Sequence, residues 1–144
     1  MKRNLSFVAL VCALCGLLLS SCCNQAAKPA GAHVDWVYNS VVYEMNVRQQ
    51  TQEGTFAAAE ERLPFLKELG VDIIWLSPVY RSPFVDQGYD ISDYYSIAEV
   101  FGSMEEFDTL LAESKKRGMS IIMDLVVNHC SDQHEWFQKA LADP

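Results

Sequence analysis

Three side chains that could do chemistry lie close together at the end of an apolar segment. Asp124, Asn128 and His129 belong to the run 119–129, and seven of its first nine residues are apolar. A short apolar run that follows a glycine, here Gly118, predicts a strand buried on both faces of a parallel sheet. Because side chains alternate along a strand, Asp124 and Asn128 share one face. His129 follows the carboxyl end, where β/α barrels build their active sites.

Asp124 is the unusual residue of this run. A carboxylate inside an apolar strand costs several kcal/mol, on the order of the penalty for an unpaired buried polar group, unless something pairs with it. Two explanations are open at this point. Asp124 is either a functional acid or a structural one, satisfied by neighbouring backbone or by an arginine.

The segments before this run alternate between strand and helix patterns. Strands are predicted at 41–47 and 71–76, and helices at 56–69 and 104–117. Pro64 interrupts the first helix, which should be kinked or split into two pieces. This alternation predicts a parallel α/β sheet. No G-x-G-x-x-G or Walker-type glycine loop follows a strand, which argues against nucleotide binding.

The connection 77–102 is long, at 26 residues, and long loops inside compact domains are usually functional. It is rich in aromatic and acidic residues, among them Tyr89, Asp90 and Tyr94. Aromatic rings pack on the C–H faces of sugars and carboxylates accept sugar hydroxyls, so this composition suits a carbohydrate. A packed tyrosine-rich loop without a ligand explains it equally well.

The amino terminus has the pattern of an export signal. Lys2 and Arg3 precede an apolar region that ends at Leu19, which predicts that residues 1–21 are a signal peptide. The ending Leu19-Ser20-Ser21-Cys22 resembles the bacterial lipobox, in which the cysteine is acylated; ordinary secretion with cleavage nearby is the alternative. Residues 22–35 are small and polar and predict a flexible tether. We therefore expect an extracytoplasmic protein that is lipid-anchored to a bacterial membrane.

Charge and cysteine content restrict the partners of the exported chain. Removal of Lys2 and Arg3 from 11 basic residues leaves 9, against 19 acidic residues, for a net charge of −10. Such a protein is unsuited to nucleic acid and suits a neutral ligand such as a sugar. Cys130 is the one cysteine of residues 24–144, so no disulfide can form within them. The spacing of His129, Cys130 and His134 fits no standard zinc site.

Several of these segments together resemble the α-amylase family of glycoside hydrolases, which are (β/α)8-barrel enzymes that act on α-glucosidic bonds. Residues 124–129 match the signature D-x-x-x-N-H at the end of barrel strand 3, and residues 88–94 match G-Y-D-x-x-D-Y after strand 2. Residues 42–44 and 66–72 also fit. Residues 75–78 and 131–134 are similar to the α-glucosidase and oligosaccharide-cleaving branches. The resemblance runs from about residue 41 to residue 137.

The resemblance implies roles for individual residues. Tyr89 resembles the aromatic that stacks under the sugar at the cleaved bond, and His129 resembles the donor to the hydroxymethyl oxygen of that sugar. Asp124 resembles a buried acid that pairs with an arginine of the site, and Asp90 resembles a support for the same subsite. Asn128 matches a residue that binds structural calcium in many α-amylases. No cofactor is required, and structural calcium is left open, because 49–54 does not match the calcium loop of some relatives.

The resemblance also implies that essential parts are missing. The nucleophile, the acid/base and the transition-state carboxylate of the family match no residue of 1–144. We therefore expect residues 36–144 to be a partial catalytic barrel, comprising strands 1 to 3 and the start of the following loop domain. Such a fragment of a secreted retaining glycosidase, acting on starch-like glucans or maltooligosaccharides, should be inactive alone. A non-catalytic surface glycan-binding lipoprotein, and a transglycosylase or isomerase of the same fold, are the alternatives.

We predict that Cys22 is acylated, because the lipobox-like ending follows a complete apolar region. Cells fed a radioactive fatty acid should yield labelled protein in the membrane fraction. The Cys22→Ser variant should lose both the label and the membrane association, whereas Cys23→Ser should keep both. Labelled, membrane-bound Cys22→Ser protein would show that the lipobox assignment is wrong.

Overall fold

The computed structural model describes residues 35–143. The predicted signal peptide 1–21, Cys22 and the tether up to residue 34 lie outside the described residues. The chain divides into two units after Tyr38. Of the first unit, the described part belongs to the 3-10 helix η1 (Asp35–Asn39). No helix within residues 35–143 has the length and apolar character needed to cross a membrane.

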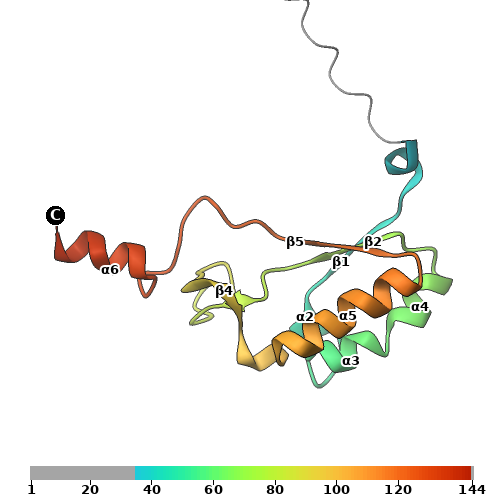
Figure 1. Cartoon of the computed structure of the whole chain (residues 1–144), viewed down its shortest axis with the longest axis horizontal. Coiled ribbons are helices and arrows are strands. Elements are labelled where there is room, and N and C mark those ends of the chain that lie inside the picture. Colours follow the sequence, from blue (N-terminus) through green and yellow to red (C-terminus); the bar gives the residue numbers. More distant parts are fainter. Residues whose placement is uncertain (1–34, 144) are drawn as a thin grey trace, which may run out of the picture. The chain divides into compact units, whose positions relative to one another are not determined.

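The second unit contains a three-stranded parallel sheet, with strand order β1-β2-β5 (Figure 1). These strands are β1 (Val42–Met45), β2 (Ile73–Leu76) and β5 (Ser120–Met123). In register, Glu44 pairs with Trp75, and Trp75 pairs with Ile122. The predicted alternation of parallel strands and helices is confirmed.

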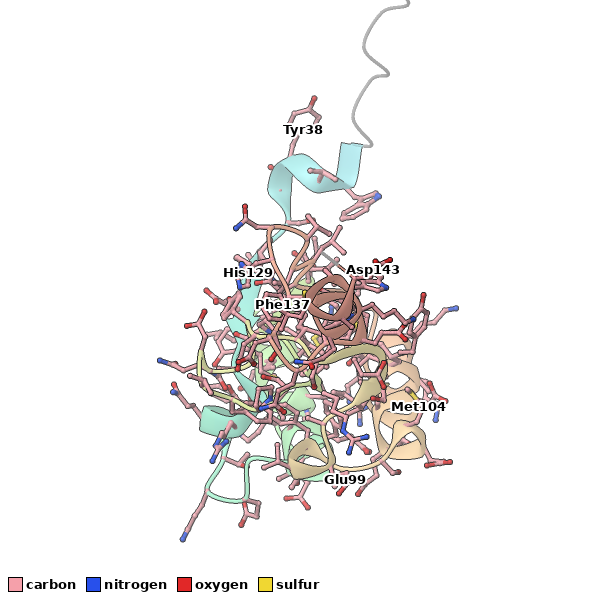
Figure 2. All side chains as sticks on the ribbon, turned by 90° about the vertical axis from the view of Figure 1, so that its left-hand side faces the viewer. Tyr38, Glu99, Met104, His129, Phe137 and Asp143 are labelled. Atoms are coloured by element: carbon pink, nitrogen blue, oxygen red, sulfur yellow. The ribbon has the colours of Figure 1, made fainter. Side chains whose placement is uncertain are left out.

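Helices cover one face of this sheet (Figure 1). They are α2 (Val47–Gln50), α3 (Phe56–Glu60), α4 (Leu63–Glu68) and α5 (Met104–Lys116). The helix predicted over 56–69 is split in two, because Pro64 enters the first turn of α4, where its missing N–H costs no hydrogen bond. α5 begins with a capping box, in which Ser103 and Glu106 each accept a backbone N–H of the other. Figure 2 labels Glu99 and Met104, which flank this start.

The core lies between the sheet and these helices. Ile74 and Leu76 of β2 are fully buried there against Phe56, Leu63 and Leu66. The opposite face of the sheet is partly open, because Val42 is 52%, Trp75 37% and Ile122 48% exposed. The prediction that the last strand is buried on both faces is therefore wrong for the described residues. In a closed barrel this second face would point into the barrel interior.

The last strand is also shorter than the sequence pattern indicates. A strand was expected over 119–128 with His129 just past its end, yet β5 ends at Met123 and residues 124–129 are irregular. The partner strand β2 ends at Leu76 and is followed by Ser77 and Pro78. Asp124 N donates to Leu76 O at 3.0 Å, as the last step of this ladder. Beyond it β2 offers no further strand to pair with, so the apolar segment 125–127 leaves the sheet.

The long connection 77–102 contains structure that the sequence analysis did not anticipate. β3 (Tyr80–Arg81) and β4 (Asp93–Ile97) form an antiparallel pair, and the 3-10 helix η2 (Glu99–Phe101) follows. After β5 the described chain ends with α6 (Glu135–Ala142). The hairpin places residues 82–92 as a loop near the carboxyl end of the sheet.

Two glycines with positive φ allow the local geometry of this fold to be tested. Gly54 (φ +70°) lies where an added Cβ would be 2.9 Å from the backbone oxygen of Arg48, and Gly70 (φ +88°) has no atom within 4 Å of that position. In the protein expressed from its complete reading frame, Gly70→Ala should lower the free energy of unfolding by about 1–2 kcal/mol through backbone strain alone. Gly54→Ala should lower it further, because the steric clash adds to the strain. Urea titration measures both, and equal losses would contradict the steric argument.

Candidate functional site at the carboxyl end of the sheet

Tyr89 and Asp124 meet at the carboxyl end of the sheet, although they lie 35 residues apart in sequence. The Tyr89 hydroxyl donates to Asp124 Oδ2 at 3.0 Å. Asp124 is half-buried just after β5. An arginine partner was expected from the family pattern, but none of the ion pairs within residues 35–143 includes Asp124. In the described part of the chain, the cost of removing Asp124 from water is offset by a tyrosine hydroxyl and by partial exposure.

The phenols around Asp124 are held in their neutral form. Burial, then the hydrogen bond to Asp124 and its charge, raise the pKa of Tyr89, and the charges of Glu44 and Asp86 add to this effect. Burial and the Asp124 charge also raise the pKa of Tyr80. A neutral Tyr89 keeps its proton available for the hydrogen bond to Asp124. Its ring is thereby oriented by the carboxylate, as a stacking platform requires.

The carboxylate of Asp90, the neighbour of Tyr89, accepts hydrogen bonds from its own loop. Its Oδ1 accepts from Ser82 Oγ at 2.8 Å and from Asp86 N at 3.1 Å, and its Oδ2 accepts from Val85 N at 2.9 Å. Burial alone would raise the pKa of Asp90, but these hydrogen bonds outweigh it and lower that pKa below its ordinary value. Asp90 thus organises residues 82–90 and supports Tyr89 through the backbone.

His129 lies at the surface beyond β5 (Figure 2). Its ring Nδ1 is 3.3 Å from Asn128 Nδ2, and no hydrogen bond joins it to Tyr89 or Asp124 within the described residues. Its backbone, in contrast, is fixed, because the Tyr94 hydroxyl contacts the carbonyl oxygens of Val126 at 2.8 Å and His129 at 3.0 Å. His129 therefore presents an exposed imidazole from an anchored backbone.

The sequence analysis missed this anchoring role of Tyr94. The Tyr94 ring packs against His134 and is stacked on Trp136, with centroid separations of 5.4 and 5.8 Å. His134 is buried, and its Nδ1 accepts from Trp136 N as the N-cap of α6. The signal was available, because Tyr94 ends the G-Y-D-x-x-D-Y segment. What the pattern does not reveal is which carbonyl groups that hydroxyl reaches.

Asn128 is the residue that the family resemblance links to structural calcium. The Asn128 side chain is exposed, and no group of three or more His, Cys, Asp or Glu side chains able to hold a metal ion occurs within residues 35–143. Calcium prefers several oxygen ligands, among them carboxylates. The described residues around Asn128 do not supply such a set.

Comparison with known proteins agrees with this geometry. Residues 34–144 match the family model "Alpha amylase, catalytic domain". The chain belongs to the α-amylase family. The resemblance inferred from residues 88–94 and 124–129 is thereby confirmed. The β1-β2-β5 sheet and its helices are the amino-terminal portion of a TIM barrel.

Relatives within this family cover related chemistries. The chain is 47% identical to a glucan 1,6-α-glucosidase of Streptococcus dysgalactiae subsp. equisimilis over 114 residues, which are 76% of this chain and 21% of the relative. Two solved structures each match 73% of this chain and 20% of their own. They are trehalose-6-phosphate hydrolase of Bacillus licheniformis (48% identity, TM-score 0.69) and trehalulose synthase of Pseudomonas mesoacidophila MX-45 (46%, 0.68). The chain thus spans about a fifth of the length of these proteins.

The role assigned to Asp90 predicts a pH-dependent stability difference. In the protein expressed from its complete reading frame, Asp90→Asn should lower the free energy of unfolding near neutral pH by about 1–3 kcal/mol, because hydrogen bonds to a charged acceptor are lost. The folded-state pKa of Asp90 is lowered, so its stabilisation is present above the ordinary aspartate pKa and is lost as pH falls through the folded value. The difference between wild type and variant should therefore shrink below about pH 4.

Urea titrations at several pH values measure this difference. Asp108→Asn is a matched control, since Asp108 is an exposed aspartate of α5 without a side-chain hydrogen bond in the described residues. This control should leave stability unchanged. A stability loss in Asp90→Asn that is the same at pH 7 and pH 3 would contradict the charged-acceptor role.

Proposed function

We propose that the protein containing this chain hydrolyses α-glucosidic bonds in starch-like glucans or maltooligosaccharides. The observation that carries the proposal is the hydrogen bond between Tyr89 and Asp124, which joins the two family motifs at the carboxyl end of the sheet. Active sites of β/α barrels lie at this end. The family match and the similarity to a glucan 1,6-α-glucosidase support an α-glucoside as substrate.

In the proposed mechanism these residues hold the sugar. Tyr89 stacks under the ring at the bond to be cleaved, and Asp124 fixes the orientation of the Tyr89 hydroxyl. His129 donates a hydrogen bond to a sugar hydroxyl from a backbone that Tyr94 anchors. These contacts position the substrate, and they accelerate the reaction only as far as they strengthen in the transition state.

The bond-breaking steps need two further carboxyl groups. A retaining glycosidase uses a nucleophile and an acid/base about 5–5.5 Å apart on either side of the bond. The Asp90 carboxylate accepts hydrogen bonds from its own loop, and the Asp124 carboxylate accepts one from the Tyr89 hydroxyl. We propose that the nucleophile and the acid/base are supplied from outside residues 1–144. The 144-residue chain assayed alone should then release no glucose from any α-glucoside.

A transglycosylase or isomerase is the second candidate, favoured by the similarity to a trehalulose synthase. An isomerase converts one disaccharide into another without equivalent release of monosaccharide, whereas a hydrolase releases both halves. Product analysis by chromatography after incubation with α-linked disaccharides separates the two. Binding of oligosaccharides without any turnover would instead favour the glycan-binding lipoprotein.

We also propose an extracytoplasmic location with a lipid anchor at Cys22. The support is the sequence pattern of residues 1–22 together with the acidic composition that follows. Such an anchor would hold the catalytic barrel near a membrane surface.

Substitutions at the sugar-holding residues test the proposed function. In the protein expressed from its complete reading frame, His129→Ala should lower kcat/KM by one to two decades, equivalent to about 1–3 kcal/mol for a lost hydrogen bond to the substrate. Asp124→Ala should do at least as much harm and should also lower the melting temperature, because the Tyr89 hydroxyl loses its acceptor. Asp108→Ala is the control and should match wild type. Wild-type kinetics in both site variants would show that these residues do not act on the substrate.

A further inference from the structure

We propose that His134 is a positioning residue: as the N-cap of α6 it holds the backbone at His129 in place, acting through Trp136 and Tyr94. This inference rests on the proposed function, in which His129 donates to a sugar hydroxyl, and adds a residue that controls this contact from outside the site. No hydrogen bond or ring contact joins the His134 and His129 side chains directly within the described residues. His134 therefore acts on His129 through the residues between them.

The segment between Asp124 and Ser131 has few fixed points. Its two ends are fixed, because the backbone N–H groups of Asp124 and Ser131 donate to backbone carbonyls at 3.0 and 2.9 Å. Between these ends, no backbone–backbone hydrogen bond forms within residues 35–143. The Tyr94 hydroxyl contacts the carbonyl oxygens of Val126 and His129 instead. The position of Tyr94 therefore determines where His129 lies.

Regular strand pairing does not fix Tyr94. Tyr94 belongs to β4, but the β3–β4 register is interrupted between Tyr80 and Arg81, and residues 94–96 have no partner in that register. A bulge of this kind bends the strand and leaves residues unpaired. The Tyr94 ring is packed between other rings, tilted against Tyr80 at 5.9 Å and stacked on Trp136 at 5.8 Å. Trp136 thus positions the Tyr94 ring from α6.

His134 fixes the start of α6 and with it Trp136. The first N–H groups of a helix have no partner within the helix and need an acceptor from outside it. His134 is 4% exposed, and its Nδ1 accepts from Trp136 N at 3.1 Å. Its ring also contacts the Trp136 ring, with a centroid separation of 4.4 Å. Without this cap the first turn of α6 can fray, and the indole loses its fixed place against Tyr94.

Three variants separate the cap from general stability. His134→Ala removes the cap, and His134→Asn restores it, because asparagine is a preferred N-cap residue. Ser103→Ala is the matched control, since Ser103 is the N-cap of α5, a helix that carries no residue of the candidate site. It shows what the loss of a helix cap does when the helix does not lead to His129. All variants are made in the protein expressed from its complete reading frame.

Kinetics on nitrophenyl α-glucoside test the proposal first. His134→Ala should lower kcat/KM about tenfold, because a displaced His129 no longer holds the sugar in the productive geometry. His134→Asn should stay within about threefold of wild type, since the cap is present again. Ser103→Ala should match wild type.

A double-mutant cycle identifies the residue through which His134 acts. In the His129→Ala background, His134→Ala should lower kcat/KM by less than about twofold, because the contact that it positions is already lost. Equal losses in both backgrounds, or a His134→Asn variant as impaired as His134→Ala, would overturn the proposal.

The thiol of Cys130 gives a readout that does not depend on activity. Cys130 follows His129 directly, is partly exposed and lines a hollow together with Tyr94. Its rate of alkylation by iodoacetamide, measured by mass spectrometry of the peptide that contains it, reports how often this segment opens. His134→Ala should raise the rate at least about threefold. Ser103→Ala should leave it at the wild-type value.

This readout separates the positioning role from the proposed function. Tyr94→Phe keeps the ring but removes the hydroxyl that contacts His129 O, and should also raise the alkylation rate of Cys130. His134→Asn should restore a rate near that of wild type. Such a pattern would support the role of His134 even if the protein hydrolysed no α-glucoside. An unchanged rate in His134→Ala would overturn the proposal.

Discussion

The candidate site depends on one constraint: the segment after β5 has no partner strand, because β2 has already ended. β2 ends before Pro78, which has no N–H to donate, and the ladder stops at the hydrogen bond from Asp124 N to Leu76 O. Backbone carbonyls beyond this point need other donors if they are to be buried. The Tyr94 hydroxyl supplies its single proton to two of them, Val126 O and His129 O. Together with the hydrogen bond from Ser131 N to Ile91 O, this shared contact holds the backbone at His129 in place.

Much of the fold could be predicted from the sequence, because its signals are local. Pro64 divides a helix and the Ser103–Glu106 pair begins one, and both effects arise within a single turn. The end of β5 could not be predicted this way. Residues 125–127 are as apolar as a strand requires, but whether they pair is decided by where β2 ends, about 50 residues earlier in the chain. The β3–β4 hairpin was missed because its two residues in β3 are too few to produce an alternating pattern.

The candidate site was predictable in part for a similar reason. Family motifs identified Tyr89, Asp90, Asp124 and His129 as a set, and the structure brings Tyr89 and Asp124 into contact. The motifs do not show that the Asp90 carboxylate faces its own loop, since that depends on where the N–H groups of Asp86 and Val85 point.

The residues of the G-Y-D-x-x-D-Y segment have two different structural roles. Asp90 and Asp93 hold their own loop, since Asp93 accepts from Tyr95 N at 2.8 Å and from Ser96 Oγ at 2.6 Å. Tyr94 instead reaches across to the segment after β5. The polar atoms of these residues form hydrogen bonds with the backbone and with neighbouring side chains. Together these residues fix the position of Tyr89.

Tyr89 is the member whose hydroxyl contacts the carboxylate of the other motif. The main structural effect of the segment is therefore to hold the Tyr89 ring in position.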